Sequence, residues 1–241
     1  MKVKERRKAE KRLFFCLLYA IMQGKGEKKM QKPDLSQALT PALLEEVIPD
    51  ALDYGQDIEN CHFYGEDFPS LSGETLEFCG CLFEKCSFSA CGAERLVFVD
   101  CVFEGCDLNA MLFPKSTFQR VAFKNCRMTG TQFTESVLMN VSFEECQMDY
   151  ANFARTKAQH MAFARCALKE SVFFELKWQS MAFRECNLRR SEWMRTPMKG
   201  LDVRSCEIEG IVVEATNLRG LKVNSQQALL LSAMLGLVIG D

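Results

Sequence analysis

The chain has 241 residues, of which 48% are hydrophobic and 26% are charged, and its formal net charge at pH 7 is −2. These proportions are typical of a folded globular protein and exclude a disordered chain that is poor in apolar residues and rich in charge. The length alone allows one or two domains.

The first 29 residues differ from the rest. A basic run from Lys2 to Arg12 precedes a ten-residue apolar stretch, Leu13 to Met22, which is too short to span a membrane. This stretch has the length of the apolar part of a secretory signal, but no A-x-A-like cleavage site follows it. The codons for residues 25–30 can spell a purine-rich ribosome-binding sequence. We therefore favour the hypothesis that Met30 is the initiator and that residues 1–29 are a leader that the native protein does not translate.

Residues 30–57 are expected to form an N-terminal cap that contains a short helix. Thr40 is the expected N-cap and Pro41 the first helical residue, and the helix is expected to end near Pro49. Its apolar stripe consists of Leu43, Leu44, Val47 and Ile48. Such a cap is needed because the open end of a repeat array exposes core side chains and unpaired backbone groups.

From residue 58 to residue 223 a large apolar residue recurs at every fifth position, a spacing that fits neither a helix nor a strand. Of the 34 positions in this register only Gly73, Ala93 and Ala158 are small, and 16 of the 19 phenylalanines and both tryptophans occupy it. A fixed period of this kind indicates a repeat architecture. The unbroken register favours one domain for residues 58–223 and leaves no room for long projecting loops.

Eleven of the 13 cysteines stand two positions before the large apolar residue. We therefore expect one bulky and one small side chain of every five to point inward, while the other three, which carry most of the charge, face solvent. Interior cysteines are expected to stay reduced and to pack as small apolar residues. A metal-binding thiol ladder is the alternative, but the paired C-x-x-C spacings of a zinc site are missing.

The register also has a 20-residue superperiod, as expected if four units of five residues make one coil. One column of this superperiod is the predicted core ladder, which consists of Phe83, Phe103, Phe123, Phe143, Phe163 and Phe183. Another column is preceded at every level by cysteine, from Cys86 to Cys206. About eight coils follow, and a spacing of ~4.8 Å between paired strands makes the rod roughly 40 Å long.

Several units resemble the Ala-(Asp/Asn)-Leu-x-x motif of the pentapeptide repeat proteins. The matching segments are Cys106-Asp107-Leu108, Ala151-Asn152-Phe153, Cys186-Asn187-Leu188 and Thr216-Asn217-Leu218. The resemblance implies an all-β solenoid, namely a right-handed quadrilateral β-helix with short helical caps at its N- and C-terminal ends.

The repeat stops after Val223, and residues 224–241 are expected to form a C-terminal capping and dimerisation segment. Ser225 is expected to begin a helix that runs from Gln226 to Leu235, with Gly236 as its stop. Its apolar residues lie on all sides, so one side can cover the last coil while the other needs a partner, most simply a second copy across a two-fold axis. The residues expected at this homodimer interface are Leu229, Leu230, Met234, Leu235, Leu237 and Ile239.

The tail, from Asn217 to Val223 and on to Ile239, also resembles the tail of the Qnr-type quinolone-resistance pentapeptide repeat proteins. In that branch of the family the tail makes the dimer. The resemblance implies a rod that mimics duplex DNA, binds DNA gyrase and topoisomerase IV, and protects them from quinolones.

Motifs for catalysis are missing from the sequence, which has no phosphate loop, nucleophile elbow or zinc helix motif. His62 and His160 stand at outward positions and are interpreted as surface residues. The adjacent Glu144 and Glu145 fit a solvated corner better than an acid–base pair. We therefore expect a non-enzymatic, cytoplasmic interaction protein with no catalytic, cofactor-binding or metal-binding residues and no membrane contact.

Charge is divided unevenly along the repeat, since residues 41–110 carry a net −13 and residues 111–200 a net +6. A uniformly acidic rod would attract the cationic DNA-binding saddle of a topoisomerase along its whole length, and this rod would do so over part of it. The predicted partner-binding surface consists of Glu66, Asp67, Glu77, Glu84, Glu94, Asp100, Glu104 and Asp107.

Two alternatives stay open. The first is an interaction scaffold for an unrelated partner, which would contact Phe174 and Met194 at equivalent outward positions. The second is direct nucleic-acid binding by the basic middle of the chain, which we do not expect because glutamates are interleaved with the basic residues. These basic residues are Arg155, Lys157, Arg165, Arg184, Arg189, Arg190 and Arg195.

Overall fold

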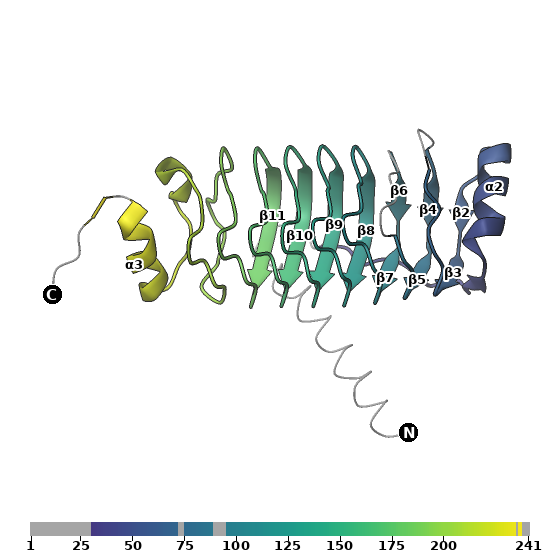
Figure 1. Ribbon diagram of the computed structural model, residues 1–241, viewed down its shortest axis with the longest axis horizontal. Helices are drawn as coiled ribbons and strands as arrows, with labels where there is room; N and C mark the ends of the chain where they lie inside the picture. Colours follow the sequence, from purple (N-terminus) through teal and green to yellow (C-terminus); the bar gives the residue numbers. More distant parts are fainter. Residues whose placement is uncertain (1–29, 72–74, 89–94, 235, 238–241) are drawn as a thin grey trace, which may run out of the picture.

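The computed structural model describes residues 30–71, 75–88, 95–234 and 236–237. In this part of the chain the polypeptide winds into stacked coils with a helix at each end (Figure 1). The paired strands are parallel, and within the repeat the partners are 20 residues apart, as for Phe63 with Phe83 and Phe123 with Phe143. The predicted all-β solenoid with four five-residue units per coil and two short helical caps is confirmed.

Two adjacent faces of the solenoid carry the regular strands. In the first coils each face has its own short strand, whereas in later coils one eight-residue strand runs over both faces. The strands of one face are β2 (Ile58–Glu59), β4 (Glu77–Cys79) and β6 (Val97–Val99). Those of the next face are β1 (Thr40–Pro41), β3 (Cys61–Tyr64), β5 (Leu82–Glu84) and β7 (Val102–Glu104). The long strands are β8 (Thr117–Lys124), β9 (Val137–Glu144), β10 (Lys157–Ala164) and β11 (Lys177–Arg184).

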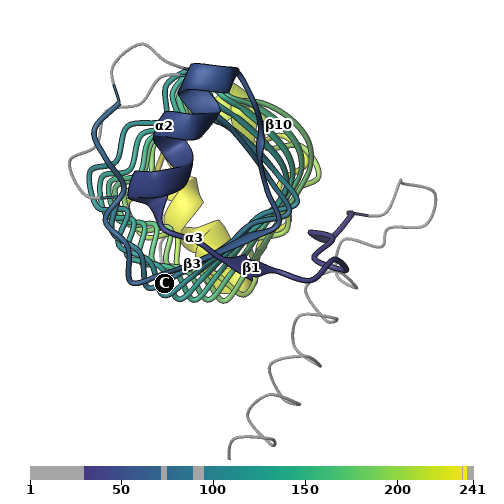
Figure 2. The ribbon, with the colours of Figure 1, turned by 90° about the vertical axis from the view of Figure 1, so that its right-hand side faces the viewer.

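The other two faces are joined by single parallel bridges with the same 20-residue step. Asp107 pairs with Arg127 on one of them, and Gln132 pairs with Asn152 on the other. The view along the axis in Figure 2 shows the coils superposed in one closed outline. From Leu112 onward the coils of the long strands therefore bond to their neighbours on all four sides.

Left-handed residues form the corners of the coil. They recur every five positions, two residues after the bulky inward side chain, and Ala110, Asn140 and Arg155 have φ values of 53°, 58° and 56°. A β-branched residue is strained at positive φ. Accordingly, no Val, Ile or Thr occupies this position from Gly80 to Gly210.

The predicted core ladder is buried and stacked from coil to coil. Ring centroids of Phe83 and Phe103 lie 4.7 Å apart, and those of Phe123 and Phe143 lie 5.0 Å apart with nearly parallel planes. A second stack, from Phe113 to Trp193, meets this ladder edge to face. Because the ring spacing matches the strand spacing, the same stacking repeats at every level.

Where the small inward residue is Cys, Ser or Thr, it can also donate a hydrogen bond to the preceding coil. The Sγ of Cys126 lies 3.5 Å from the carbonyl oxygen of Phe103, and the Oγ1 of Thr156 lies 2.7 Å from that of Phe133. The 11 cysteines among the described residues are free thiols. Burial raises the pKa of Cys101, Cys146 and Cys186, which keeps these donors protonated.

At the N-terminal end, α2 (Leu44–Tyr54) covers the first coil with a stripe of Leu44, Ile48 and Ala51. The predicted start of this helix at Pro41 and its predicted end near Pro49 are wrong. Pro49 lies inside the helix with an exposed side chain, and the helix ends at Gly55, whose φ is 62°.

The start was misplaced because Thr40 and Pro41 form β1 instead. They pair with Cys61 and His62, and the amide of Thr40 donates to the carbonyl of Asn60 at 2.8 Å. An unpaired edge of the first coil can thus recruit residues whose local pattern is that of a helix start.

Before β1 the chain runs along one corner of the rod. Met30 is buried against Ala162 and Ala164, and the amide of Gln31 donates to the Oδ1 of Asn140 at 2.9 Å. His160 lies at the same corner and is only 5% exposed, so its interpretation as a surface residue is wrong. Residues 30–40 lack the repeat pattern, and the sequence therefore did not indicate this contact.

At the C-terminal end the chain forms η1 (Ala215–Leu218) and then α3 (Ser225–Met234), which begins at the predicted Ser225. The Nε2 of Gln227 donates to the carbonyls of Val203 and Cys206, both at 2.7 Å, and fixes the helix on the last coil. Gly236 adopts the left-handed conformation expected of a helix stop, with φ at 72°.

Some expectations lie outside the described residues. These are the leader at residues 1–29, the roles of Glu94, Leu235 and Ile239, and the absence of loops at residues 72–74 and 89–94. The 20-residue step is kept on either side of both internal segments, because Ile58 pairs with Phe78 and Phe78 with Phe98. Among the helices that the structure describes, none has the length and apolar content needed to cross a membrane.

Candidate interaction surfaces

The outer side of α3 presents apolar side chains at the end of the rod. Leu229, Leu230 and Met234 are 56%, 48% and 41% exposed, and Leu237 beyond the helix is 59% exposed. The opposite side of α3 is occupied by the buried Gln227 and Leu231. The helix therefore caps the last coil with one side and leaves an apolar surface on the other, as the sequence indicated.

Carboxylates gather on the first coils. Glu84 and Glu104 are direct partners in β5 and β7, and Asp67 and Asp107 share one column with Ser87 between them. Like charges on neighbouring strands repel and cost stability. The strongly negative net charge of residues 41–110 is therefore concentrated in neighbouring coils.

Three of the predicted acidic residues also have a structural role. Glu66 accepts a hydrogen bond from the amide of Leu44 at 3.4 Å, in the first turn of α2, where a negative charge is favourable. Asp100 accepts from Arg120 at 2.6 Å, and Asp107 pairs with Arg127. These three carboxylates are less available to a partner than the exposed Asp67, whereas Glu84 is half-buried and lies 3.4 Å from the Nε2 of His62.

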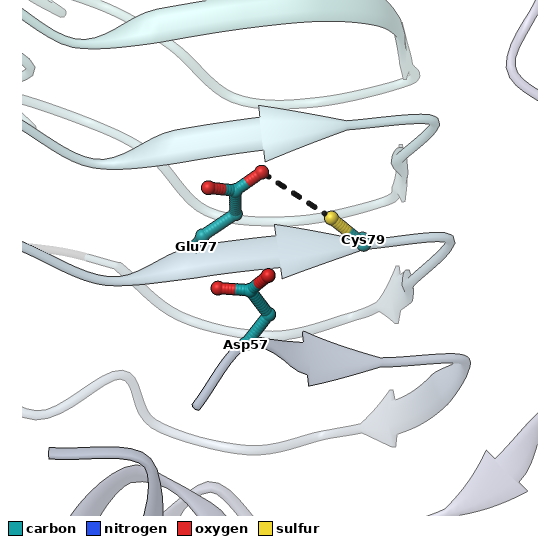
Figure 3. Close-up of side chains that lie close together, drawn as sticks. All are labelled: Asp57, Glu77 and Cys79. Atoms are coloured by element: carbon teal, nitrogen blue, oxygen red, sulfur yellow. Dashed lines mark hydrogen bonds between the residues drawn. The ribbon is translucent and has the colours of Figure 1, made fainter. Parts of the chain in front are cut away.

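Asp57, Glu77 and Cys79 bring their oxygen and sulfur atoms within 4.8 Å of one another (Figure 3). The Sγ of Cys79 donates to the Oε1 of Glu77 at 3.5 Å. Burial, and next the hydrogen bond to Glu77, raise the pKa of Cys79 to about 12. The cluster offers one thiol and two carboxylates, and we assign no role to it.

The arginines of the basic middle are paired with glutamates. Arg165 lies 2.8 Å from Glu144, and Arg195 lies 2.8 Å from Glu175. The remaining pairs are Arg155 with Glu175, Arg184 with Glu185, Arg189 with Glu207 and Arg190 with Glu170. The interleaved charges thus neutralise one another, which argues against an extended nucleic-acid surface.

Phe174 and Met194 do not form an exposed apolar patch. Both side chains are half-buried, and the guanidinium of Arg195 lies 5.8 Å from the ring centre of Phe174. These two residues therefore do not support the hypothesis of an interaction scaffold for an unrelated partner.

A hollow of about 830 Å³ opens beside these residues, and the sequence analysis missed it. Trp178 belongs to the inward register, yet its side chain is half-buried and its Nε1 donates to the carbonyl of Pro197 at 2.9 Å. The charged residues that line the hollow are Arg155, Lys157, Glu175, Lys177, Arg195 and Lys199. A signal was available, since Lys157 and Lys177 stand 20 residues apart and so in one column.

Comparison with solved structures finds similar folds at low sequence identity. Full-length QnrB1, a plasmid-mediated fluoroquinolone resistance protein, is 24% identical over 76% of this chain and 91% of its own, with a TM-score of 0.42. A pentapeptide repeat protein from the Arabidopsis thaliana thylakoid lumen is 17% identical over 41% of this chain and 66% of its own, with a TM-score of 0.30. HetL, a pentapeptide repeat protein involved in heterocyst differentiation in Nostoc, is 8% identical over 75% and 94%, with a TM-score of 0.27.

A search of curated protein sequences gave no match. The family model described as "Pentapeptide repeat region" matches residues 76–153 and 136–222, which together make up more than half of the chain. These are the coils whose inward ladder, small donor residues and left-handed corners repeat every five residues. The chain therefore belongs to the pentapeptide repeat family.

Proposed function

We propose that the protein is a non-enzymatic, cytoplasmic rod that binds DNA gyrase or topoisomerase IV and protects the enzyme from quinolone-type inhibitors. The observation that carries this proposal is the cluster of carboxylates on the first coils of the rod. Its similarity in sequence to QnrB1 and the resemblance of its tail to that of the Qnr-type proteins support the same function.

The charge of the first coils suits a partner that binds duplex DNA. Residues 41–110 contain 15 acidic and two basic residues, and a chain starting at Met30 carries a net −9. A DNA-binding surface is cationic, and its attraction to an acidic rod is long-ranged and falls with salt. The first coils, with the exposed Asp67 and the half-buried Glu84, are therefore the proposed contact with the topoisomerase.

The apolar side of α3 is the proposed homodimer interface. Exposed leucine side chains next to each other favour association, and a closed two-fold interface brings the same residues of two copies together. A dimer would double the length of the rod and place one acidic region at each end.

Binding of purified gyrase tests the proposal. We expect the chain from Met30 to bind immobilised gyrase with an affinity that falls as salt rises, and Asp67→Asn/Glu84→Gln to weaken binding by roughly tenfold. The matched control, Glu192→Gln/Glu209→Gln, removes two exposed carboxylates at the other end of the rod and should bind like wild type. An equal loss in both variants, or no binding at all, would contradict the proposed contact.

Light scattering after gel filtration tests the dimer separately. Wild type is expected as a dimer and Leu229→Lys/Leu230→Lys as a folded monomer with an unchanged far-ultraviolet spectrum. A monomeric wild-type protein would refute the dimer and leave the proposed gyrase contact standing. A dimer without affinity for gyrase would instead indicate a rod that serves an unrelated partner.

A further inference from the structure

One corner of the rod beside the hollow carries an alternating column of charge. A nitrogen of Arg155 lies 3.8 Å from Glu135 and another lies 3.3 Å from Glu175, which in turn lies 2.8 Å from Arg195. Hydrogen bonding to Arg195 lowers the pKa of Glu175, so its carboxylate stays charged. The positive and negative charges of this column are paired, so neighbouring side chains in it do not repel one another.

The neighbouring column behaves differently. Lys157 and Lys177 are direct partners in β10 and β11, and both are exposed. No ion pair to either ammonium group forms within the described ranges. In the three preceding coils the same column holds the uncharged Val97, Thr117 and Val137. Two lysines directly opposite each other are destabilising unless a negative charge lies between them.

Lys199 brings a third ammonium group to the same hollow, and Trp178 provides an aromatic wall. Trp178 pairs with Ala158, whose small side chain leaves the indole without a ring below it, unlike the stacked phenylalanines of the other columns. The hydrogen bond from its Nε1 to Pro197 fixes the ring at the surface. The hollow therefore combines one ordered aromatic ring with three ammonium groups that have no ion-pair partner in the described part of the chain.

We propose that this hollow binds a ligand with clustered phosphate groups. The phosphate oxygens would accept from the ammonium groups of Lys157, Lys177 and Lys199 and offset the repulsion between them, since the one carboxylate in the lining, Glu175, is paired with Arg155 and Arg195. The ring of Trp178 would pack against the organic part of the ligand, as aromatic rings do against nucleobases. A free nucleotide and the backbone of single-stranded nucleic acid share this chemistry.

Fluorescence of Trp178 provides the test. Trp193 is fully buried in a stack of phenylalanines, so Trp193→Phe leaves one tryptophan at the hollow and keeps the ladder. We expect inorganic tripolyphosphate or ATP to change the emission in a saturable manner at low salt, and Lys157→Gln/Lys177→Gln to weaken binding by roughly tenfold. If Trp193→Phe does not fold, calorimetric titration of the wild-type protein replaces the fluorescence.

The control variant Arg189→Gln/Arg190→Gln removes two positive charges that are paired with Glu207 and Glu170 outside the hollow. It should bind the phosphate probes like wild type. A short oligothymidine forms the second arm of the experiment. Lysine-dependent binding of the oligonucleotide alone would assign the site to a nucleic-acid backbone, and binding of tripolyphosphate or ATP would assign it to a free ligand. Absence of binding, or an equal loss in both double variants, would overturn the proposal.

Discussion

Phe143 lies in the middle of the aromatic ladder, with the rings of Phe123 and Phe163 stacked 5.0 Å and 4.9 Å away. Its replacement by alanine would leave a cavity that the neighbouring coils cannot fill, because their backbone is fixed by hydrogen bonds on both sides. We expect Phe143→Ala to lower the free energy of unfolding by ~3–5 kcal/mol in denaturant titrations. Tyr150→Ala, at a 51% exposed corner, is the control and should change little. A loss below about 1 kcal/mol for Phe143→Ala would refute the central role of the ladder.

The left-handed corners make a second residue-scale prediction. Ala110 is exposed and has a φ of 53°. Ala110→Val should cost ~1–2 kcal/mol, since a β-branched side chain is strained there, whereas Ala110→Gly should be neutral or slightly stabilising. Thermal unfolding of the two variants measures the difference. Equal stability of the two would show that the corner does not select against branching.

The third residue-scale prediction concerns the reactivity of two cysteine thiols. Burial raises the pKa of Cys61 to about 11 and that of Cys79 to about 12, and the neutral thiol is a weak nucleophile. We expect both to react slowly with iodoacetamide at pH 8 and faster above pH 10, in an assay that resolves each cysteine by mass spectrometry. Rapid reaction of the folded protein at pH 8 would contradict these shifts.

The same shifts predict how stability depends on pH. The folded pKa is higher than the unfolded value of about 8.5, so the folded state holds the proton more tightly. The stabilisation is fully present below the unfolded pKa and is lost as pH rises toward the folded pKa. A Cys61→Ser/Cys79→Ser variant should therefore lose less thermal stability between neutral pH and pH 10 than wild type.

At the scale of the elements, the contact between α3 and the last coil depends on one buried amide. Gln227 donates to two backbone carbonyls at the end of the rod. Gln227→Leu keeps the size of the side chain but removes both bonds, and we expect a loss of ~1–3 kcal/mol and weaker hydrogen-exchange protection of α3. The neighbouring Gln226 is exposed, so Gln226→Leu is a matched control and should unfold like wild type. Unchanged protection in Gln227→Leu would show that apolar contacts alone hold the helix.

The sequence predicted the repeat elements better than the ends. The ladder from Phe83 to Phe183 and the small inward residues follow from a period that every coil repeats. The absence of β-branched residues at the corners was a further signal that was available and unused. The start of α2 was misplaced because Thr40 and Pro41 pair with an open strand edge, a long-range contact that no local pattern records.

Two features of the candidate surfaces could not be predicted from the five-residue period of the sequence. Trp178 belongs to the inward register, but the small Ala158 on the preceding coil and the carbonyl of Pro197 on the next hold it at the surface. His160 is buried at a corner along which the segment from Met30 runs. Both depend on contacts with residues that break the repeat, and the sequence shows such breaks without showing what fills them.

On the scale of the whole molecule, the rod is acidic in its first coils and carries a net +6 over residues 111–200. The ion pairs of Arg155, Arg165 and Arg195 with glutamates reduce the positive potential of this middle part without cancelling it. This distribution predicts a contact that covers part of the rod, not its full length. The apolar side of α3 would then set the spacing between two such contacts in the homodimer.

The most direct test of this account is DNA supercoiling by purified gyrase in the presence of a quinolone, with the chain from Met30 titrated in. We predict that supercoiling recovers at substoichiometric to stoichiometric protein, that Glu192→Gln/Glu209→Gln restores it equally well, and that Asp67→Asn/Glu84→Gln needs roughly tenfold more protein. Supercoiling that stays inhibited at every concentration of a folded rod would contradict the proposed protection of gyrase.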